Sequence, residues 1–507
     1  MVARAPLVRE PLAIPLREAR APLVLAIDVG TSGLRAFVFD AKARPIGSAV
    51  AWSRKAARTS RLGEASLDAD ERARATFDCV DTVLRVIGRR AGEIAAVSVS
   101  TFWHSLVGVD ARGRPTTRVI TWADTRARDA ALSLRQELDE SEVHARTGCM
   151  LHASYLPAKL RWLAAAAPET VARTAHWMSF GEYLYYRAFG ERRAAHGMAS
   201  ATGLYAQRGA GWDRPMLAHL GLDERALSPV SDEPLEGLAR AFARRWPALA
   251  QVPWIPAVGD GACSNVGAGA VRPDTAALMV GTSGALRVVR ETADAPVVRG
   301  GWTYRLDARR VVCGGALSNG GNALAWIARA FPGVDLEATL RRPVGAHGLV
   351  ALPLLAGDRS PSWDDAARAS IAGIGLGSAP EDVVQAFVEG IVCRFARLWR
   401  VVDAALPGIE RVVATGGDAL SRPYLVQLLA DALGRPLVAS AAGEGSARGA
   451  AIVALERIGA IGDLGSIRSP LGRVFRPRAR AHAAFGEAVE RQARLEDALR
   501  PIGGVAS

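Results

Sequence analysis

A five-residue segment, VGTSG, occurs twice in this chain and limits the folds that the chain can adopt. The copies occupy residues 29–33 and 280–284. An apolar run precedes each copy and another follows it, at 34–39 and 285–289, which is typical of two short strands joined by a glycine turn. The repeat therefore predicts two β-hairpins in equivalent places of a duplicated chain.

Glycine turns of this kind can hold phosphate. Without a side chain in the way, successive backbone N–H groups and the neighbouring hydroxyls can point toward an anion. Two such turns facing each other would grip one polyphosphate. An ordinary hairpin turn is the alternative for one copy alone, but two identical copies after apolar runs favour a duplicated nucleotide site.

The residue before each copy differs in a way that indicates a metal ion. Asp28 stands before the first copy, whereas Met279 stands before the second. A carboxylate beside a phosphate is repulsive unless a cation lies between them. Asp28 therefore predicts a bound Mg2+ ion.

Length and composition indicate two globular domains, because 507 residues of which 50% are hydrophobic can bury two cores. Five cysteines without paired spacing fit a reducing compartment and argue against disulfides or zinc. No apolar run approaches the roughly 20 residues that span a bilayer. We expect a cytoplasmic protein that binds no membrane, with residues 1–22 as a disordered or loosely docked extension.

The net charge of +12 does not indicate a nucleic-acid binder. Nearly every positive charge is an arginine, and the arginines are interleaved with Asp and Glu along the whole chain. A basic arm or a basic-aromatic stripe is missing from the sequence. The positive field would instead attract anionic small molecules such as ATP or a sugar acid.

The order of expected elements predicts an α/β fold. Strands at 23–28, 34–39 and 46–52 precede a helix at 69–90 and a strand at 94–100, and the second half starts the same way near residue 275. Duplicated α/β halves form a cleft between them. We expect domains at 23–254 and 255–480, followed by a C-terminal helix and tail at 481–507.

Two segments of the first half carry candidate substrate-binding residues. Trp103 and His104 follow the strand at 94–100, and the carboxyl end of a strand is a usual place for ligand contacts. The alternative for His104 is a histidine at the sheet edge whose hydrogen bonds are satisfied within the protein. Asp124 and Arg126 lie close to Trp122 in the sequence. The ring of Trp122 can stack on a sugar, the carboxylate of Asp124 can accept hydrogen bonds from hydroxyls, and the guanidinium of Arg126 can bind an anionic group. The alternative is an Asp–Arg ion pair on the surface.

Two further residues stand out by their type. Lys159 is the only lysine in the long middle of an arginine-rich chain, which indicates selection for its side chain. Asp260 is flanked by Gly259 and Gly261, so a ligand can approach its carboxylate closely. Asp260 is the best candidate for a general base, and an N-cap role is compatible with that.

One helix can be predicted in detail. Ser378 and Glu381 match a capping box. The apolar residues that follow recur at helical spacing through Val402, which indicates a core helix of the second domain without a ligand role.

Taken together, these motifs resemble the FGGY family of carbohydrate kinases, within the actin-like ATPase superfamily. Similar motifs run from about residue 23 to 460 and include LAGDRSPSW at 355–363 and TGGD at 415–418, which resembles an adenosine motif. The resemblance implies two ribonuclease-H-like domains around a cleft, MgATP as phosphate donor and Asp260 as catalytic base. It also implies ATP or phosphate contacts from Gly30, Thr31, Ser32, Arg35, Gly281, Thr282, Ser283, Gly315, Gly416, Gly417 and Asp418.

Within that family the sequence is most similar to the gluconate kinases, on residues such as Arg126, His152 and Arg287. This similarity implies transfer of the γ-phosphate of ATP to a sugar or sugar acid, with D-gluconate first, and a homodimer. Arg126, His104 and Lys159 are the expected partners of a substrate carboxylate. The alternatives are a kinase of a neutral sugar such as xylulose and a non-catalytic ATP- or sugar-binding protein of the same fold.

Overall fold

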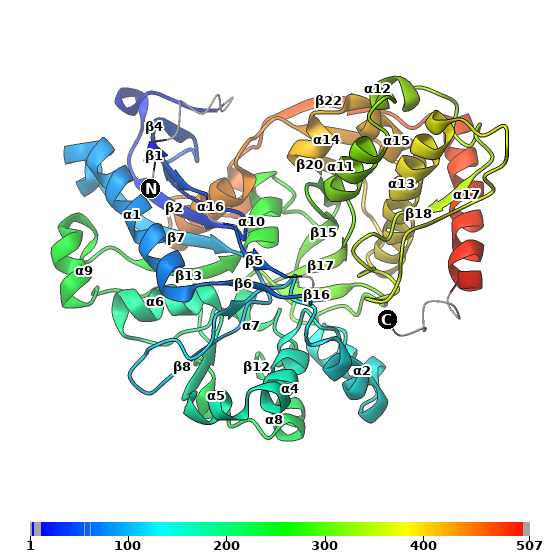
Figure 1. Ribbon diagram of the computed structural model, residues 1–507. Helices are drawn as coiled ribbons and strands as arrows, with labels where there is room; N and C mark the ends of the chain where they lie inside the picture. Colours follow the sequence, from blue (N-terminus) through cyan, green and yellow to red (C-terminus); the bar gives the residue numbers. More distant parts are fainter. Residues whose placement is uncertain (1–2, 5–11, 55, 61, 500–507) are drawn as a thin grey trace.

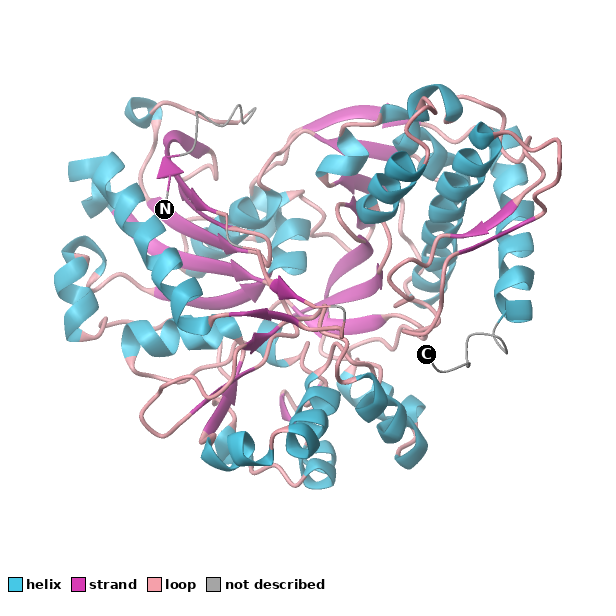
Figure 2. Ribbon diagram, viewed as in Figure 1, coloured by secondary structure: helices cyan, strands magenta, loops and turns pink. Residues whose placement is uncertain are grey.

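The computed structural model describes residues 3–4, 12–54, 56–60 and 62–499. Two mixed β-sheets form the centres of two α/β halves, with helices against their faces (Figures 1 and 2). The predicted duplicated α/β architecture is confirmed. Within the described residues no helix is long and apolar enough to cross a membrane.

The first sheet has six strands in the order β1-β4-β3-β2-β7-β13. Strands β2, β3 and β4 form an antiparallel meander, and β7 and β13 continue the sheet in parallel with β2. Every residue of β2 is buried, as expected for a central strand that is covered on both faces. The bounds are β1 Ala3–Arg4, β2 Leu23–Val29, β3 Leu34–Phe39, β4 Pro45–Ser53, β7 Ile94–Thr101 and β13 Trp254–Gly259.

The second sheet repeats this arrangement. Its order is β16-β17-β15-β14-β20-β21-β22, in which β17, β15 and β14 are antiparallel and β20 and β21 run parallel to β14. The bounds are β14 Thr275–Val280, β15 Gly284–Glu291, β16 Trp302–Arg305, β17 Arg310–Leu317, β20 Arg411–Thr415, β21 Leu437–Ser440 and β22 Leu471–Phe475.

Two helices join the halves at their centre. Helix α10 (Asp260–Gly267) follows β13, and α16 (Gly445–Arg457) follows β21, the equivalent strand of the second sheet. They cross so closely that a Cβ atom on Gly449 would lie 1.8 Å from the carbonyl oxygen of Cys263. Figure 1 shows the pair between the two sheets. The buried residues of α16 belong to the same core cluster as β2 and β7, so the chain returns to the first half after residue 445.

The remaining helices cover the sheets or build an insertion. Helix α1 (Ala69–Ile87) packs on the first sheet, whereas α13 (Pro380–Ala405) and α15 (Pro423–Leu433) pack in the second core with α17 (Ala479–Leu499). Between β7 and β13 the chain forms an insertion, most of which lies below the first sheet in Figure 1, whereas α9 lies to the left of that sheet. Its main elements are β8 Val107–Val109, β9 Val119–Ile120, α2 Arg128–Glu137, α3 Glu140–Thr147, α4 Leu156–Ala166, α5 Pro168–Arg173, β10 His176–Met178, α6 Phe180–Phe189, α7 His196–Ala199, α8 Arg214–Leu220 and α9 Arg240–Arg245.

Part of the expected N-terminal extension lies against the first half. Within residues 12–22, Ile14 exchanges backbone hydrogen bonds with Pro45 and Gly47 of β4, and Arg90 donates to the carbonyl of Ala19. Residues 1–2 and 5–11 of that extension, and the expected tail at 500–507, lie outside the described residues. Strand β13 follows the expected division at residue 254 but pairs with β7, so it belongs to the first sheet.

Candidate functional site

A cavity of about 120 Å³ lies between the two halves. The first half contributes residues that follow β7 and β13, and the second contributes residues of β14 to β17 and of the segment 359–363. Asp260 lines this cavity, and so does Ser283, which belongs to the second glycine turn. The wall consists of Trp103, His104, Trp122, Ser154, Tyr155, Asp260, Met279, Ser283, Arg287, Trp302, Tyr304, Ala316, Arg359 and Trp363.

Asp260 is the carboxylate of this cavity. It is the first residue of α10, with Gly259 in the N-cap position, and its Oδ1 accepts a hydrogen bond from the Gly261 N–H at 2.7 Å. Burial raises the pKa of Asp260 from 3.8 to about 6; Arg287 opposes this rise and the negative charge of Asp28 adds to it. A carboxylate with such a pKa can accept a proton near neutral pH.

Trp103 positions the loop that carries Asp260. A Cβ atom on Gly259 would lie 1.9 Å from Trp103 Nε1, and one on Gly261 would lie 2.4 Å from its ring, so the indole lies directly on this backbone. Trp103 Nε1 donates to the carbonyl of Gly197 at 3.0 Å. Packing against Trp103 therefore requires glycine on both sides of Asp260, in addition to the close access that glycine gives to a ligand.

The two VGTSG segments are hairpin turns, as predicted. Gly30 N donates to Gly33 O at 2.8 Å and Gly281 N donates to Ser283 O at 3.0 Å. Ser32 and Thr282 are exposed, and Thr31 is half-buried. The start of α11 (Gly321–Ala330) supports the second turn, because the N–H groups of its first two residues donate to carbonyls of that turn at 2.7 and 3.0 Å.

Asp28 and Arg35 lie beside the first turn and are paired. Arg35 Nη2 is 3.4 Å from Asp28 Oδ2, and Arg35 also forms an ion pair with Glu444 at the start of α16. Burial raises the pKa of Asp28, an effect that Arg35 opposes. Across the described residues, no group of three or more His, Cys, Asp or Glu side chains is arranged to hold a metal ion by itself.

The other glycines expected at the nucleotide have distinct surroundings. Gly315 is buried, and a Cβ atom there would lie 2.3 Å from Leu398 of α13. Gly416 has φ of +91°, and a Cβ atom there would lie 2.2 Å from Val280 O, so packing alone requires glycine at both places. Gly417 has open space around it and begins α14 (Gly417–Leu420). The side chain of Asp418 lies outside the described residues.

His104 lines the cavity, and its contacts determine which ring nitrogen carries a hydrogen and whether the ring is charged. Its Nδ1 lies 2.6 Å from the carbonyl oxygen of Ala201, which can only accept, so Nδ1 carries the hydrogen. Burial lowers the pKa of His104 to about 3. The ring is therefore neutral, and Nε2 is left as an acceptor for a hydroxyl.

Asp124, Arg126 and Lys159 are not on the cavity wall. Asp124 accepts from the N–H of Ala65 at 3.0 Å and pairs with Arg126 at 2.6 Å, which is the Asp–Arg pair weighed as an alternative. Lys159 is fully buried and donates to the carbonyls of His104 and Thr121, the latter at 2.9 Å. These contacts hold the segment around Trp122 in place next to the cavity.

Several wall residues were not expected from the sequence. Trp302 and Tyr304 of β16 stack with ring centroids 4.1 Å apart, and the hydroxyl of Tyr304 lies 2.5 Å from that of Tyr155 across the interface of the two halves. No local motif indicates this pairing, since it joins residues far apart in the chain. Arg287 and Arg359 lie within the family motifs, but nothing in the sequence around them assigns a charge-pairing role to their side chains.

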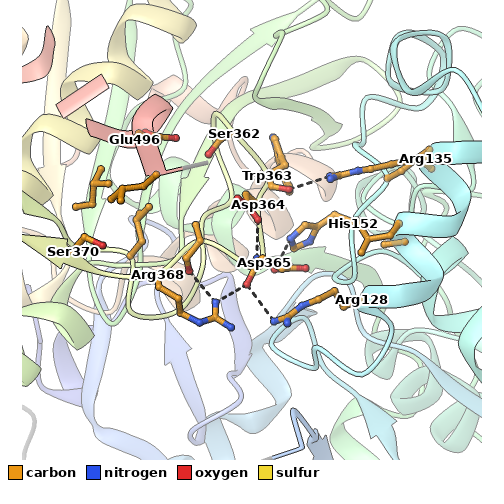
Figure 3. Close-up of a pocket in the computed structure, with 18 residues that line it drawn as sticks. Arg128, Arg135, His152, Ser362, Trp363, Asp364, Asp365, Arg368, Ser370 and Glu496 are labelled. Carbon is orange, nitrogen blue, oxygen red and sulfur yellow. Dashed lines mark hydrogen bonds and ion pairs between the residues drawn. The ribbon is translucent and has the colours of Figure 1, made fainter. Parts of the chain in front are cut away.

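A second cavity, of about 570 Å³, lies between α2 and the loop at 362–370 (Figure 3). Trp363 borders both cavities. In Figure 3, His152 points toward Asp365, at 2.9 Å, and Arg128 reaches the carbonyl of Asp365 at 3.2 Å. The second cavity contains neither Asp260 nor a glycine turn, so we place the chemistry in the smaller one.

The two parts of this chain match the two domains of one family of known proteins. The N-terminal domain of the FGGY family of carbohydrate kinases matches residues 23–267, and the C-terminal domain of that family matches residues 276–456.

Among curated relatives, gluconokinase of Bacillus subtilis is 28% identical over 402 residues, 76% of this chain and 78% of the relative. Xylulose kinase of Streptomyces rubiginosus is 34% identical over 350 residues, 68% of this chain and 69% of the relative. The fold is similar to the crystal structure of gluconate kinase from Lactobacillus acidophilus, with a TM-score of 0.86 and 22% identity over 95% of this chain and 98% of that one.

Proposed function

Because this chain belongs to the FGGY family of carbohydrate kinases, enzymes that transfer phosphate from ATP to an alcohol, we propose that its acceptor is a sugar acid, with D-gluconate as the first candidate. The observation that carries this proposal is the charge of the cavity wall. Two guanidinium groups, Arg287 and Arg359, share the wall with one carboxylate, Asp260. A wall with excess positive charge suits an anionic acceptor, and gluconokinases are among the relatives.

Asp260 acts as the general base in the proposed reaction. It takes the proton from the acceptor hydroxyl as the oxygen bonds to the γ-phosphorus of ATP, while the bond from that phosphorus to the β–γ bridging oxygen breaks and ADP leaves. The transition state of phosphoryl transfer is loose, so the protein mainly positions the reactants and stabilises charge. The expected product from gluconate is 6-phosphogluconate.

The two glycine turns hold the phosphates in this proposal. Backbone N–H groups and hydroxyls of Thr31, Ser32, Thr282 and Ser283 donate to the β- and γ-phosphates. Arg35 assists beside the first turn, and adenosine packs against the open backbone at Gly417. Closure of the two halves excludes water, which would otherwise compete for the phosphate.

Asp28 is the side chain that would hold a Mg2+ ion beside the first glycine turn. Asp28 is buried and Asp260 is half-buried, and the negative charge of Asp28 contributes to the raised pKa of Asp260. Mg2+ binds one or two carboxylates together with water and phosphate oxygens, so a third protein acid is not required. Asp28 would hold such an ion, which would supply positive charge next to the phosphates, and Asp260 would remain free to accept the proton.

A neutral ketose is the second candidate acceptor. Xylulose kinase of Streptomyces rubiginosus has the higher identity over the shorter match, and the aromatic wall around Trp302 and Tyr304 can stack on any sugar. His104, a neutral acceptor, serves a sugar hydroxyl in either case.

A coupled assay of ADP release distinguishes these acceptors. The panel contains gluconate, xylulose, ribulose, rhamnulose and glycerol, with Asp260→Asn as the inactive control for each. We expect the largest kcat/KM with gluconate. Turnover of a ketopentose without turnover of gluconate would refute the sugar-acid acceptor and leave the kinase assignment intact.

A further inference from the structure

Arg287 is a buried cation without a bonding partner among the described residues. It extends from β15 into the cavity and is 7% exposed. Its Nε and Nη1 are buried and make no hydrogen bond, and no ion pair is formed by its guanidinium. A buried charge in this condition is costly unless a ligand supplies the missing acceptors.

Arg359, which like Arg287 belongs to the second half, lines the same cavity. Its Nη2 donates to the carbonyl of Leu317 at 2.8 Å, its guanidinium lies 5.0 Å from the ring centre of Trp122, and its Nε is buried without a partner. The two arginines interact electrostatically: burial lowers the pKa of Arg287 to about 10, and Arg359 contributes to that decrease. Two like charges on one small cavity are stabilised when an anion lies between them.

The other cations that were expected to bind a substrate anion are already paired elsewhere. The guanidinium of Arg126 is bound by Asp124 and stacks 4.5 Å from the ring centre of Trp162. Lys159 donates to two carbonyl groups below the wall, and His104 is neutral. Among the described residues of the wall, Arg287 and Arg359 are the basic side chains that keep both a charge and an unpaired donor.

We propose that Arg287 and Arg359 together bind the carboxylate of the sugar-acid acceptor and thereby select it over neutral sugars. This inference rests on the proposed function and assigns its specificity to two residues. Arg287 lies against Gly261 at the start of α10 and Arg359 lies against Trp122, so a carboxylate between them is on the sugar side of the cavity, among the aromatic rings. Guanidinium groups match a carboxylate with paired hydrogen bonds.

The test compares gluconate with glucitol, which has a CH2OH group in place of the carboxylate. Binding of each is measured by calorimetry, and kcat/KM by ADP release, for the wild type, Arg287→Met, Arg359→Met and Arg287→Lys. We expect each Met variant to bind gluconate about 10- to 100-fold more weakly, as for loss of a hydrogen bond to a charged group. Glucitol binding and the KM for ATP should stay the same, and Arg287→Lys should recover part of the gluconate affinity.

Arg290→Met is the matched control. Arg290 is on the same strand, three residues from Arg287 and therefore on the opposite face, where it donates to the carbonyl of Pro407. Its substitution should change neither acceptor preference nor ATP use. Thermal unfolding of all variants verifies that they are folded.

The outcomes separate this inference from the proposed function. Wild-type turnover of gluconate with unchanged gluconate binding in both Met variants would overturn the role of the arginines alone. A higher KM for ATP with unchanged gluconate binding would also overturn it, because the anion would then be a nucleotide phosphate. Failure of the wild type to bind gluconate would refute the sugar-acid function itself.

Discussion

Each half of the molecule has an acidic residue at the start of an equivalent helix, but within the described residues only one of the two acids forms an ion pair. Asp260 begins α10 after β13, and Glu444 is the N-cap residue of α16 after β21, the corresponding strand. Glu444 forms an ion pair with Arg35 of the opposite half. Asp260 forms no ion pair in the described part of the chain and lines the cavity instead.

In the proposed reaction, this difference separates a paired acid with a structural role, Glu444, from the acid assigned as the base, Asp260. Burial raises the pKa of both carboxyl groups, but for Glu444 the charge of Arg35 and a hydrogen bond from it oppose the rise. For Asp260 the opposing charge of Arg287 acts without direct contact. A carboxylate that is destabilised and unpaired in a cavity has the properties of a general base. Under the proposed assignment, duplication supplies two similar positions, and the ion pair of Glu444 with Arg35 leaves Asp260 as the one of the two acids that is unpaired within the described residues.

The largest effect is expected for Asp260→Asn. The amide keeps the size of the side chain but cannot accept the hydroxyl proton, so kcat should fall by about 10²- to 10⁴-fold while acceptor and ATP still bind. Single-turnover ADP release and calorimetry measure the two quantities separately. Near-normal turnover of this variant would show that Asp260 is not the base and would remove the contrast with Glu444.

The close crossing of α10 and α16 is tested by Gly449→Ala. The new Cβ atom would lie 1.8 Å from the carbonyl oxygen of Cys263, so the helices must separate and we expect a loss of about 1–3 kcal/mol in the free energy of unfolding. Chemical denaturation measures this value. Gly486→Ala is the control, since Gly486 is within α17 with nothing near its Cβ position and alanine there should stabilise the protein by roughly 0.5–1 kcal/mol. Equal behaviour of the two variants would contradict a tight crossing.

The sequence predicted the parts of the fold that depend on neighbouring residues. Both glycine turns, the buried strands around them and the core face of α13 are local patterns, and all are present. The capping box predicted from Ser378 and Glu381 is wrong: α13 begins at Pro380, and Asp382 accepts from the Ala379 N–H at 2.9 Å. Ser378 instead accepts from the N–H of Gly375. Several acids and hydroxyls near Pro380 satisfy the same short pattern, so the pattern did not identify the cap.

The parts of the site that were not predicted depend on contacts between distant segments. Asp124 has the chemistry of a sugar ligand, but the N–H of Ala65 and the guanidinium of Arg126 occupy its oxygens. Arg287, by contrast, is important because no partner among the described residues reaches its buried nitrogen atoms. A sequence shows which side chains can bind a ligand, whereas only the tertiary structure shows which of them are already used within the protein.

A pH profile tests the environment of Asp260. A base with a pKa of about 6 is half ionised at that pH, so kcat/KM should reach a plateau about one unit above pH 6 and fall tenfold per pH unit well below it. His104, with a pKa of about 3, stays neutral through this range and adds no step. Because Arg287 favours the ionised carboxylate, Arg287→Met should move the acid limb to higher pH. If kcat/KM of the wild type fell only near pH 4, burial would not destabilise the ionised carboxylate of Asp260.

The smallest effect is expected for Glu444→Gln. Arg35 is 46% exposed in its side chain, and ion pairs of exposed arginines contribute about 0–1 kcal/mol, so kcat should change by less than about fivefold. Removal of the negative charge beside the first glycine turn should lower the KM for ATP within the same range, because Arg35 is then freer to face phosphate. Steady-state kinetics at fixed gluconate measure both values, with Glu490→Gln, an exposed acid of α17 paired with Arg400, as the control. A loss of kcat as large as that of Asp260→Asn would mean that Glu444 is itself part of the chemistry, and that pairing with an arginine does not distinguish the two acids.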